Sequence, residues 1–248
     1  MVPNAVFLTA HPSGDRLDLP LIRYLCRDYG ISQWSYFHAS EDSECSIDEA
    51  MTYLSEYLET LAKPVHLIGH GTGGMLAAVY AQQRPDRVRS LTLLSVATNM
   101  AHSWIGLYYQ HFWRRPCCRA AAMMQIAEAL CDSGDREGTR RFAALLHRDL
   151  RLGFSVHSPM GLASYPAAQV TVPLLVCGSA DDVVVPPHAL RQWERLFKKG
   201  DRLHLVSRGR HFFHFQSPTE VGEVIQDFWR KLSVTDNAPP PSIVSMFF

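Results

Sequence analysis

The sequence lacks any run of about 20 consecutive apolar residues, the length that an α-helix needs to span a bilayer. It also lacks a charged leader followed by an apolar stretch at residues 1–4, so no secretory signal is visible and we expect a cytoplasmic protein without a transmembrane segment. Charge of one sign is missing too: 24 Lys and Arg balance 24 Asp and Glu, a formal net charge of +0. Without a basic surplus, we expect no nucleic-acid partner.

Cysteine is scarce and unpatterned, which argues against a metal-binding or disulfide framework. None of the six cysteines forms a C-x-x-C pair, and no histidine stands beside them at ligand spacing. His11 and His70 are expected near the same pocket, but they show no recognisable ligand spacing either. We therefore predict no metal, no cofactor and reduced thiols.

What the sequence does contain is an alternation of short apolar runs and helical patterns. Apolar residues make up 47% of the 248 residues, enough for one well-buried α/β domain. Near-continuous apolar strands that alternate with helices predict a mostly parallel sheet covered on both faces. The expected strands are 5–10, 31–37, 65–68, 88–96, 172–177 and 202–206, and the expected helices are 17–29, 48–61, 75–84, 187–197 and 218–232.

A long helical segment interrupts this alternation. Residues 98–168 are rich in aromatic residues, methionine and arginine, and we expect them to form a cap on the same domain. The predicted domain therefore spans residues 1–232, with the cap inserted at about 98–168. Residues 233–248 form a proline-containing tail with an apolar end.

The chain is organised around the stretch from Val65 to Leu76, with the sequence VHLIGHGTGGML. An apolar run leads into a group of glycines and a helical run leaves it, which predicts a strand, a sharp turn and a helix. Gly69, Gly71 and Gly74 match the dinucleotide fingerprint G-x-G-x-x-G. The segment from Gly69 to Gly73 matches the nucleophile elbow G-x-S-x-G at every position but one, because Gly71 stands where the serine should be.

The dinucleotide interpretation lacks its structural context. A Rossmann site places the glycine turn after the first strand and an acidic residue at the end of the second strand. Two elements already precede this turn, and the next strand ends in the residues Leu94 to Ala97 without an acid.

Three landmarks in the right order resemble the α/β-hydrolase superfamily over roughly residues 5–232. After the elbow, residues 173–186 (PLLVCGSADDVVVP) resemble the strand and acid loop of that family, and 207–212 (SRGRHF) resemble its histidine loop. The resemblance implies an α/β-hydrolase fold with a helical cap. The antiparallel strands that usually come first in the family are expected to be missing.

The resemblance also implies roles for individual residues. His211 would be the base, and Asp181 the acid that orients it, with Asp182 as a close rival because the loop is one residue longer than the usual pattern. The backbone N–H of Thr72 would form half of an oxyanion hole, with His70 nearby. The family usually has His-Gly after its first core strand, whereas this chain has His11-Pro12, and proline has no N–H to donate.

Gly71 has no side chain that could attack a substrate, so an ordinary serine mechanism is excluded at that position. Our first hypothesis is therefore a non-catalytic binding or assembly factor, a pseudoenzyme with a vestigial Asp–His pair. One alternative is a hydrolase or lyase that acts on a small ester-like or apolar substrate through His211 and water. Another is a serine esterase in which an engineered Ser-to-Gly change traps the substrate.

Two aromatic segments are candidates for binding a protein partner. One of these segments lies in the cap and the second is the tail. We also expect a different kind of partner, a small apolar ligand in a capped pocket. The candidate contact residues are Trp104, Tyr108, Phe112 and Trp113 in the cap and Met246, Phe247 and Phe248 in the tail.

Overall fold

A computed structural model describes residues 3–37, 45–99, 119–132, 134–154 and 170–236. The predicted aromatic contacts of the cap (Trp104, Tyr108, Phe112, Trp113) and of the tail (Met246, Phe247, Phe248) lie outside these residues. So do Cys117 and Cys118. Cys26, Cys131 and Cys177 are free thiols, of which Cys131 and Cys177 are buried and Cys26 is exposed.

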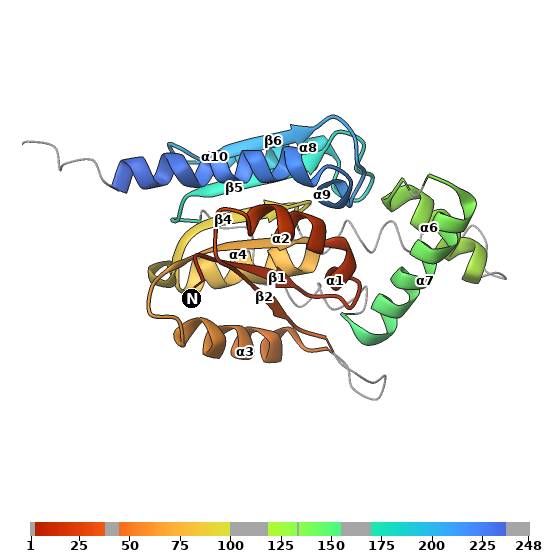
Figure 1. Cartoon of the computed structure of the whole chain (residues 1–248), viewed down its shortest axis with the longest axis horizontal. Coiled ribbons are helices and arrows are strands. Elements are labelled where there is room, and N and C mark those ends of the chain that lie inside the picture. The colour runs from red at the N-terminus through yellow and green to blue at the C-terminus, as the bar shows by residue number, and fades with distance from the viewer. Residues whose placement is uncertain (1–2, 38–44, 100–118, 133, 155–169, 237–248) are drawn as a thin grey trace, which may run out of the picture.

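The core is one parallel sheet, as the alternation of strands and helices predicts. Its strands lie in the order β2-β1-β3-β4-β5-β6, and all of the pairings between them are parallel (Figure 1). The strands are β1 (Ala5–Thr9), β2 (Ile31–Ser35), β3 (Val65–His70), β4 (Val88–Leu94), β5 (Leu174–Ser179) and β6 (Arg202–Val206). β1 and β3 are therefore neighbours, which brings the loops that follow them to one edge of the sheet.

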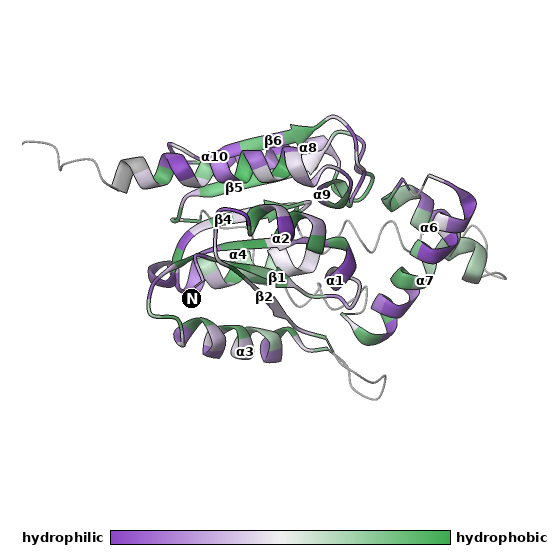
Figure 2. Ribbon diagram, in the orientation of Figure 1, coloured by the Kyte–Doolittle hydropathy of each residue, from purple (hydrophilic) through white to green (hydrophobic). Residues whose placement is uncertain are grey.

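Helices cover both faces of this sheet. They are α1 (Gly14–Leu17), α2 (Leu19–Leu25), α3 (Ile47–Glu59), α4 (Gly71–Gln83), α6 (Arg119–Leu130), α7 (Arg136–Leu152), α8 (Pro187–Leu190), α9 (Phe213–Gln216) and α10 (Pro218–Asp236), with 3-10 turns η1 (Pro85–Arg87) and η3 (Arg191–Arg195). The apolar side chains that alternate along β3 divide between two cores. Leu67 joins the core with α3 and α4, whereas Ile68 joins the one with α2 and α10. The strands accordingly carry mostly hydrophobic residues (Figure 2).

Two predicted helices differ from the observed ones. The helix expected over 17–29 is two short helices that meet at Asp18, which serves as the C-cap of α1 and the N-cap of α2, with Pro20 in the first turn of α2. Proline at that position favours a new helix start because it has no N–H to leave unpaired. The helix expected over 187–197 is α8 followed by the 3-10 turn η3.

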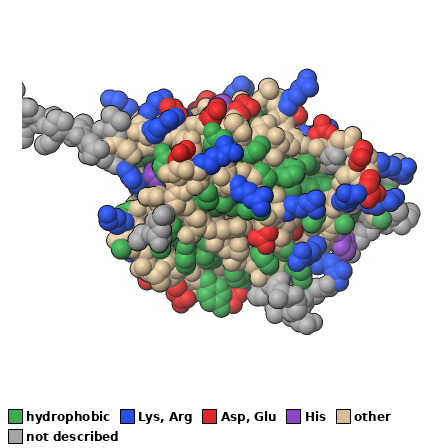
Figure 3. Space-filling view, viewed as in Figure 1, with side chains coloured by type: hydrophobic (Ala, Val, Ile, Leu, Met, Phe, Trp, Pro, Cys, Tyr) green, Lys and Arg blue, Asp and Glu red, His purple; other side chains and the backbone are tan. Residues whose placement is uncertain are grey.

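Between β4 and β5, the helices α6 and α7 pack against each other in the region that we expected to form the cap. They lie beyond the edge of the sheet where β1 and β3 end (Figure 1). Basic and acidic side chains are interspersed on the face shown in Figure 3, in keeping with the balanced composition. Among the described helices, none has the length and apolar content that crossing a membrane requires.

Buried histidines make this fold sensitive to acid. His66 of β3 stacks on Trp229 with ring centroids 4.6 Å apart, and its Nδ1 lies 2.6 Å from Ser90 Oγ. Burial and, to a lesser degree, the positive charge of Arg89 lower the pKa of His66 to about 3. Between this value and its ordinary pKa of 6.5, the unfolded chain binds a proton that the folded chain excludes.

We expect the free energy of unfolding to fall as the pH drops below about 6.5, by up to about 1.4 kcal/mol per pH unit for this one group. Denaturant unfolding between pH 7.5 and pH 4.5 measures the slope, and His66→Gln should make it shallower. Equal slopes for the two proteins would contradict the assignment of this acid sensitivity to His66.

Candidate active site

The turn between β3 and α4 has the backbone geometry of a nucleophile elbow. Gly71 follows the last residue of β3 directly and begins α4, and its φ is +50°. L-residues with a side chain rarely adopt this left-handed conformation, whereas glycine does so at no steric cost. The sequence prediction of a strand, a sharp turn and a helix is confirmed.

The other glycines of the stretch allow the helix to approach the sheet closely. A Cβ added to Gly73 would lie 2.2 Å from the backbone oxygen of Leu8, and one added to Gly69 would lie 2.5 Å from the backbone of Gly73. A Cβ on Gly74 would lie 2.6 Å from the backbone oxygen of Gly69. The close approach of the two backbones requires these glycines. A phosphate-binding role, as in a dinucleotide site, is not needed to explain them.

His211 is paired with Asp182, not with Asp181. Its Nδ1 lies 3.0 Å from Asp182 Oδ2, and both side chains are buried. The same carboxylate accepts hydrogen bonds from Ser95 Oγ at 2.8 Å and from the backbone N–H groups of Val184 and Val185 at 2.8 and 3.1 Å. Burial raises the pKa of Asp182, but the attraction of His211 and these hydrogen bonds outweigh it, so the net shift is downward and the acid is a carboxylate.

The preference for Asp181 over Asp182 as the partner of His211 is therefore corrected. Asp181 is exposed, and its carboxylate accepts hydrogen bonds from Ser179 Oγ at 2.5 Å and from the backbone N–H of Arg210 at 2.8 Å. It fastens the acid loop to the histidine loop from the solvent side. The turn in which Val184 and Val185 donate to Asp182 directs the second acid inward and the first acid outward.

His211 faces the position that a serine side chain would occupy. A Cβ built on Gly71 lies 4.0 Å from His211 Nε2, and apart from its neighbours in the chain it meets no other atom of the described residues within 4 Å. A hydroxyl oxygen one bond further would fall within hydrogen-bond reach of this nitrogen. The base and the acid of a serine triad are thus assembled around a residue without a nucleophile.

The loop after β1 is poorly equipped to stabilise an oxyanion. Pro12 has no N–H, the N–H of Ser13 donates to Asp149 Oδ1 at 2.8 Å, and that of Gly14 donates to the backbone oxygen of His11 at 3.0 Å. On the other side of the site, Thr72 lies in the first turn of α4, where backbone N–H groups have no partner within the helix. These three positions of the loop therefore offer no free N–H, and the prediction that the Thr72 N–H forms half of an oxyanion hole stays a prediction.

Both loops of the site are fastened to the helices of the inserted segment. Asp149 of α7 accepts hydrogen bonds from the backbone N–H and the hydroxyl of Ser13. The backbone oxygen of Leu130, at the end of α6, accepts from the N–H groups of His211 and Phe212 at 3.1 and 3.3 Å. Among the described residues, the inserted helices therefore hold the loops in place on either side of Gly71.

The ring of His70 packs against that of His211, with the ring centroids 4.7 Å apart. Its Nε2 donates to the backbone oxygen of His211 at 3.0 Å, and its ring lies 4.5 Å from that of His214. Burial lowers the pKa of His70 well below its ordinary value, and the three neighbouring histidines lower it further. His70 is thus a neutral imidazole at physiological pH, and its hydrogen bond to the backbone of His211 holds the histidine loop.

Several residues of this site escape sequence analysis. Ser95 and Asp149 reach the site from positions far away in the chain, and Asp18 bonds His214 across 196 residues. No motif spacing relates such residues before the fold is known. For the acid, the available signals were the pair of adjacent aspartates and the length of the loop up to Pro186, which made Asp182 the rival of Asp181.

Comparison with known proteins agrees with this geometry. A sequence profile described as "Alpha/beta hydrolase family" matches residues 9–224. The chain is 34% identical over 227 residues to an uncharacterised protein of Nostoc sp., covering 92% of this chain and 90% of the relative. It is also 34% identical over 240 residues to an uncharacterised protein of Synechocystis sp., covering 97% and 95%.

Two solved structures share the fold. An esterase from the thermophile Thermogutta terrifontis superposes with a TM-score of 0.66 at 15% identity, over 92% of this chain and 90% of the esterase. An esterase from Exiguobacterium antarcticum superposes with a TM-score of 0.67 at 15% identity, over 92% of each chain. At such identity the likeness shows the fold alone. The sheet, the elbow and the family profile together establish that the chain belongs to the alpha/beta hydrolase family.

Proposed function

We propose that this chain is a non-hydrolytic member of its family, which acts by binding and forms no covalent serine intermediate. The observation that carries the proposal is Gly71, at φ +50° in the elbow and facing His211. The nucleophile position has an intact backbone but no reactive atom. The blocked loop after β1 supports the same conclusion, because its N–H groups are lost to Pro12 or engaged by Asp149 and His11.

The proposed binding face is the edge of the sheet where the strands end. Parallel α/β sheets bind ligands in the crevice beyond the carboxyl ends of their strands, and Gly71, His211 and Thr72 all lie there. In this proposal, the His211–Asp182 pair serves to hold two loops together. The bound molecule would be a small apolar ligand or a protein partner that contacts the aromatic part of the inserted segment.

Hydrolysis by activated water is the second candidate, and the intact pair favours it. With Nδ1 of His211 committed to Asp182, Nε2 is directed toward the space above Gly71. A water molecule there could lose its proton to His211 and attack an ester directly. An engineered Ser-to-Gly trap remains a third account of Gly71, and the experiment below bears on it as well.

The test compares the hydrolysis of short p-nitrophenyl esters by the chain as given, by Gly71→Ser and by Gly71→Ser/His211→Ala. We expect the given chain to show no turnover above buffer and the serine variant to turn over, because its hydroxyl would meet His211. The rate of the serine variant should stay about 10²–10³-fold below that of an ordinary esterase, since one oxyanion donor is missing. The double variant should be inactive.

Each outcome decides between the candidates. Ester hydrolysis by the given chain that His211→Ala abolishes would overturn the non-hydrolytic proposal in favour of activated water. If Gly71→Ser reached full esterase rates, the blocked loop would be irrelevant, and a recent or engineered loss of the serine would explain Gly71 better.

A further inference from the structure

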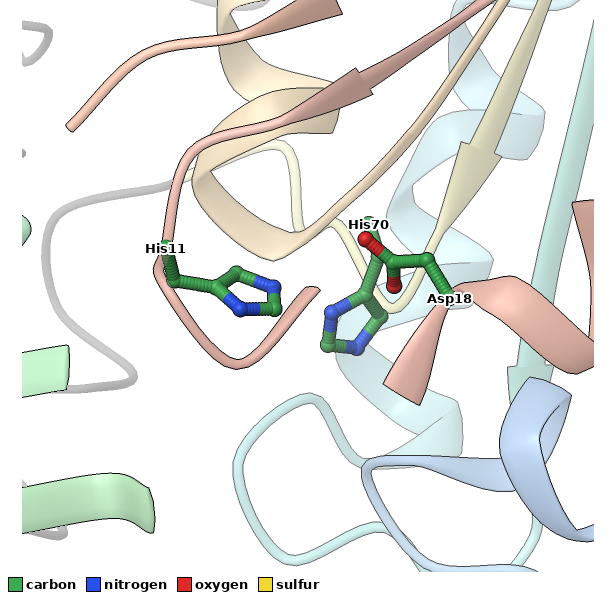
Figure 4. Close-up of side chains that lie close together, drawn as sticks. All are labelled: His11, Asp18 and His70. Carbon is green, nitrogen blue, oxygen red and sulfur yellow. The ribbon is translucent and has the colours of Figure 1, made fainter. Parts of the chain in front are cut away.

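A second cluster of ionisable side chains, which does not include His211 or Asp182, lies next to the elbow. His11 lies in the loop after β1, Asp18 at the junction of α1 and α2, and His70 at the end of β3. One ligand atom from each of the three side chains lies within 4.8 Å of the others. Figure 4 shows the two imidazole rings pointing toward one another, with the carboxylate beside His70.

The hydrogen bonds of His70 fix which nitrogen carries its proton. Nε2 faces the backbone oxygen of His211 at 3.0 Å, and a carbonyl oxygen only accepts, so Nε2 holds the hydrogen. In the neutral ring, Nδ1 then carries a lone pair. Nδ1 is buried and has no hydrogen-bond partner among the described residues.

The same reasoning applies to His11. Its Nδ1 lies 3.1 Å from Ser13 Oγ, whose own hydrogen is directed to Asp149, so the histidine is the donor in this contact. In the neutral ring Nε2 then carries the lone pair. This nitrogen too is buried without a hydrogen-bond partner within the described part of the chain. Two lone pairs thus face each other in a buried space, an arrangement that a cation would stabilise.

Asp18 supplies the negative charge. It is fully buried, and it accepts hydrogen bonds from Thr9 Oγ1 at 2.8 Å on Oδ2 and from His214 Nε2 at 3.0 Å on Oδ1. Each carboxylate oxygen has a second lone pair that these bonds leave available. Such outer hydrogen bonds are typical of metal-ligating carboxylates and imidazoles, because they fix the orientation of the ligands.

We propose that His11, Asp18 and His70 bind one divalent transition-metal ion, with Zn²⁺ as the best match. Imidazole nitrogens suit Zn²⁺ and its neighbours, whereas Ca²⁺ and Mg²⁺ prefer sites made of oxygen alone. Three protein ligands leave a fourth, open position. Bonds of about 2.1 Å at tetrahedral angles place ligand atoms about 3.4 Å apart, so binding draws the cluster inward. His11 is the part that can move, since it lies in a loop and its side chain is 17% exposed.

The test is calorimetric titration of the chelator-treated full chain with ZnCl₂. We expect one ion per chain, and an affinity at least about 10-fold weaker in His11→Ala and in Asp18→Asn. His188→Ala, which removes a histidine on α8, is the matched control and should bind like the unchanged chain. Circular dichroism checks that each variant is folded. If His11→Ala fails this check, Asp18→Asn, which keeps the shape of the side chain, still tests the proposal.

Substitution with Co²⁺ identifies the ligands independently of affinity. A site of two nitrogens and one oxygen gives visible absorption bands without the near-ultraviolet sulfur-to-cobalt band of cysteine ligation. The proposal is overturned if the chain binds no stoichiometric ion, if His11→Ala and Asp18→Asn bind as tightly as the unchanged chain, or if the sulfur band appears. None of these readouts depends on ester hydrolysis, so the metal site and the non-hydrolytic function can fail separately.

Discussion

Asp182→Ala is expected to lower the free energy of unfolding by about 3–5 kcal/mol, because several buried hydrogen-bond donors would each lose their acceptor at a cost of roughly 1–3 kcal/mol. The carboxylate is buried and accepts hydrogen bonds from His211, Ser95 and the N–H groups of Val184 and Val185. Alanine would leave the donors of His211, Val184 and Val185 buried without this acceptor, whereas Ser95 Oγ still reaches the backbone oxygen of His211 at 3.3 Å. Urea unfolding at pH 7.5 measures the change.

Asp181→Ala is the matched control, one residue away. Asp181 is exposed, and its substitution removes hydrogen bonds from Ser179 and from the backbone of the histidine loop, so we expect a cost of about 1 kcal/mol. If Asp182→Ala fails to fold, Asp182→Asn retains an oxygen for the two backbone donors and should fall between the other two proteins. A larger loss for Asp181→Ala than for the Asp182 variants would show that the pairing of His211 is assigned wrongly.

Gly73→Ala is expected to have the second large effect, a loss of more than about 3 kcal/mol or failure to fold. The new Cβ would lie 2.2 Å from the backbone oxygen of Leu8 and 2.9 Å from its carbon. No rotation of a side chain can relieve this clash because the opposing atoms belong to the backbone of β1. The whole of α4 would have to move away from the sheet.

Gly71→Ala separates this packing effect from backbone strain. Its φ of +50° costs a residue with a Cβ about 1–2 kcal/mol, but the space around it is open. Circular dichroism and urea unfolding of the two variants should therefore give a clearly more stable Gly71→Ala. Equal stabilities would contradict the close approach of α4 to β1.

Much of the fold could be predicted from the sequence because its signals are local. The strand before the elbow, the glycines and the helix after them are adjacent in the chain, and the observed turn from His70 to Gly71 follows from them. The order of the landmarks placed His211 and the acid loop in one site. Packing on both faces of the sheet followed from the near-continuous apolar strands.

The errors arose where the folded geometry decides which residues meet. Asp181 was favoured over its rival Asp182, whereas a turn stabilised by the N–H groups of Val184 and Val185 directs Asp182 inward. Spacing also gave no reason to join Asp18 to His11 and His70, since these three residues meet only once β1 and β3 are neighbours. The metal prediction from the sequence was therefore negative, and the geometry points the other way.

The most direct measurement of the central claim, that the elbow keeps its geometry but has no nucleophile, is intact-mass spectrometry after treatment with a fluorophosphonate. This reagent forms a covalent bond with a serine that a neighbouring histidine activates. The account predicts no adduct on the given chain, one adduct at position 71 of Gly71→Ser, and none on Gly71→Ser/His211→Ala. An adduct on the given chain would reveal another activated nucleophile and contradict the account, as would an unreactive Gly71→Ser.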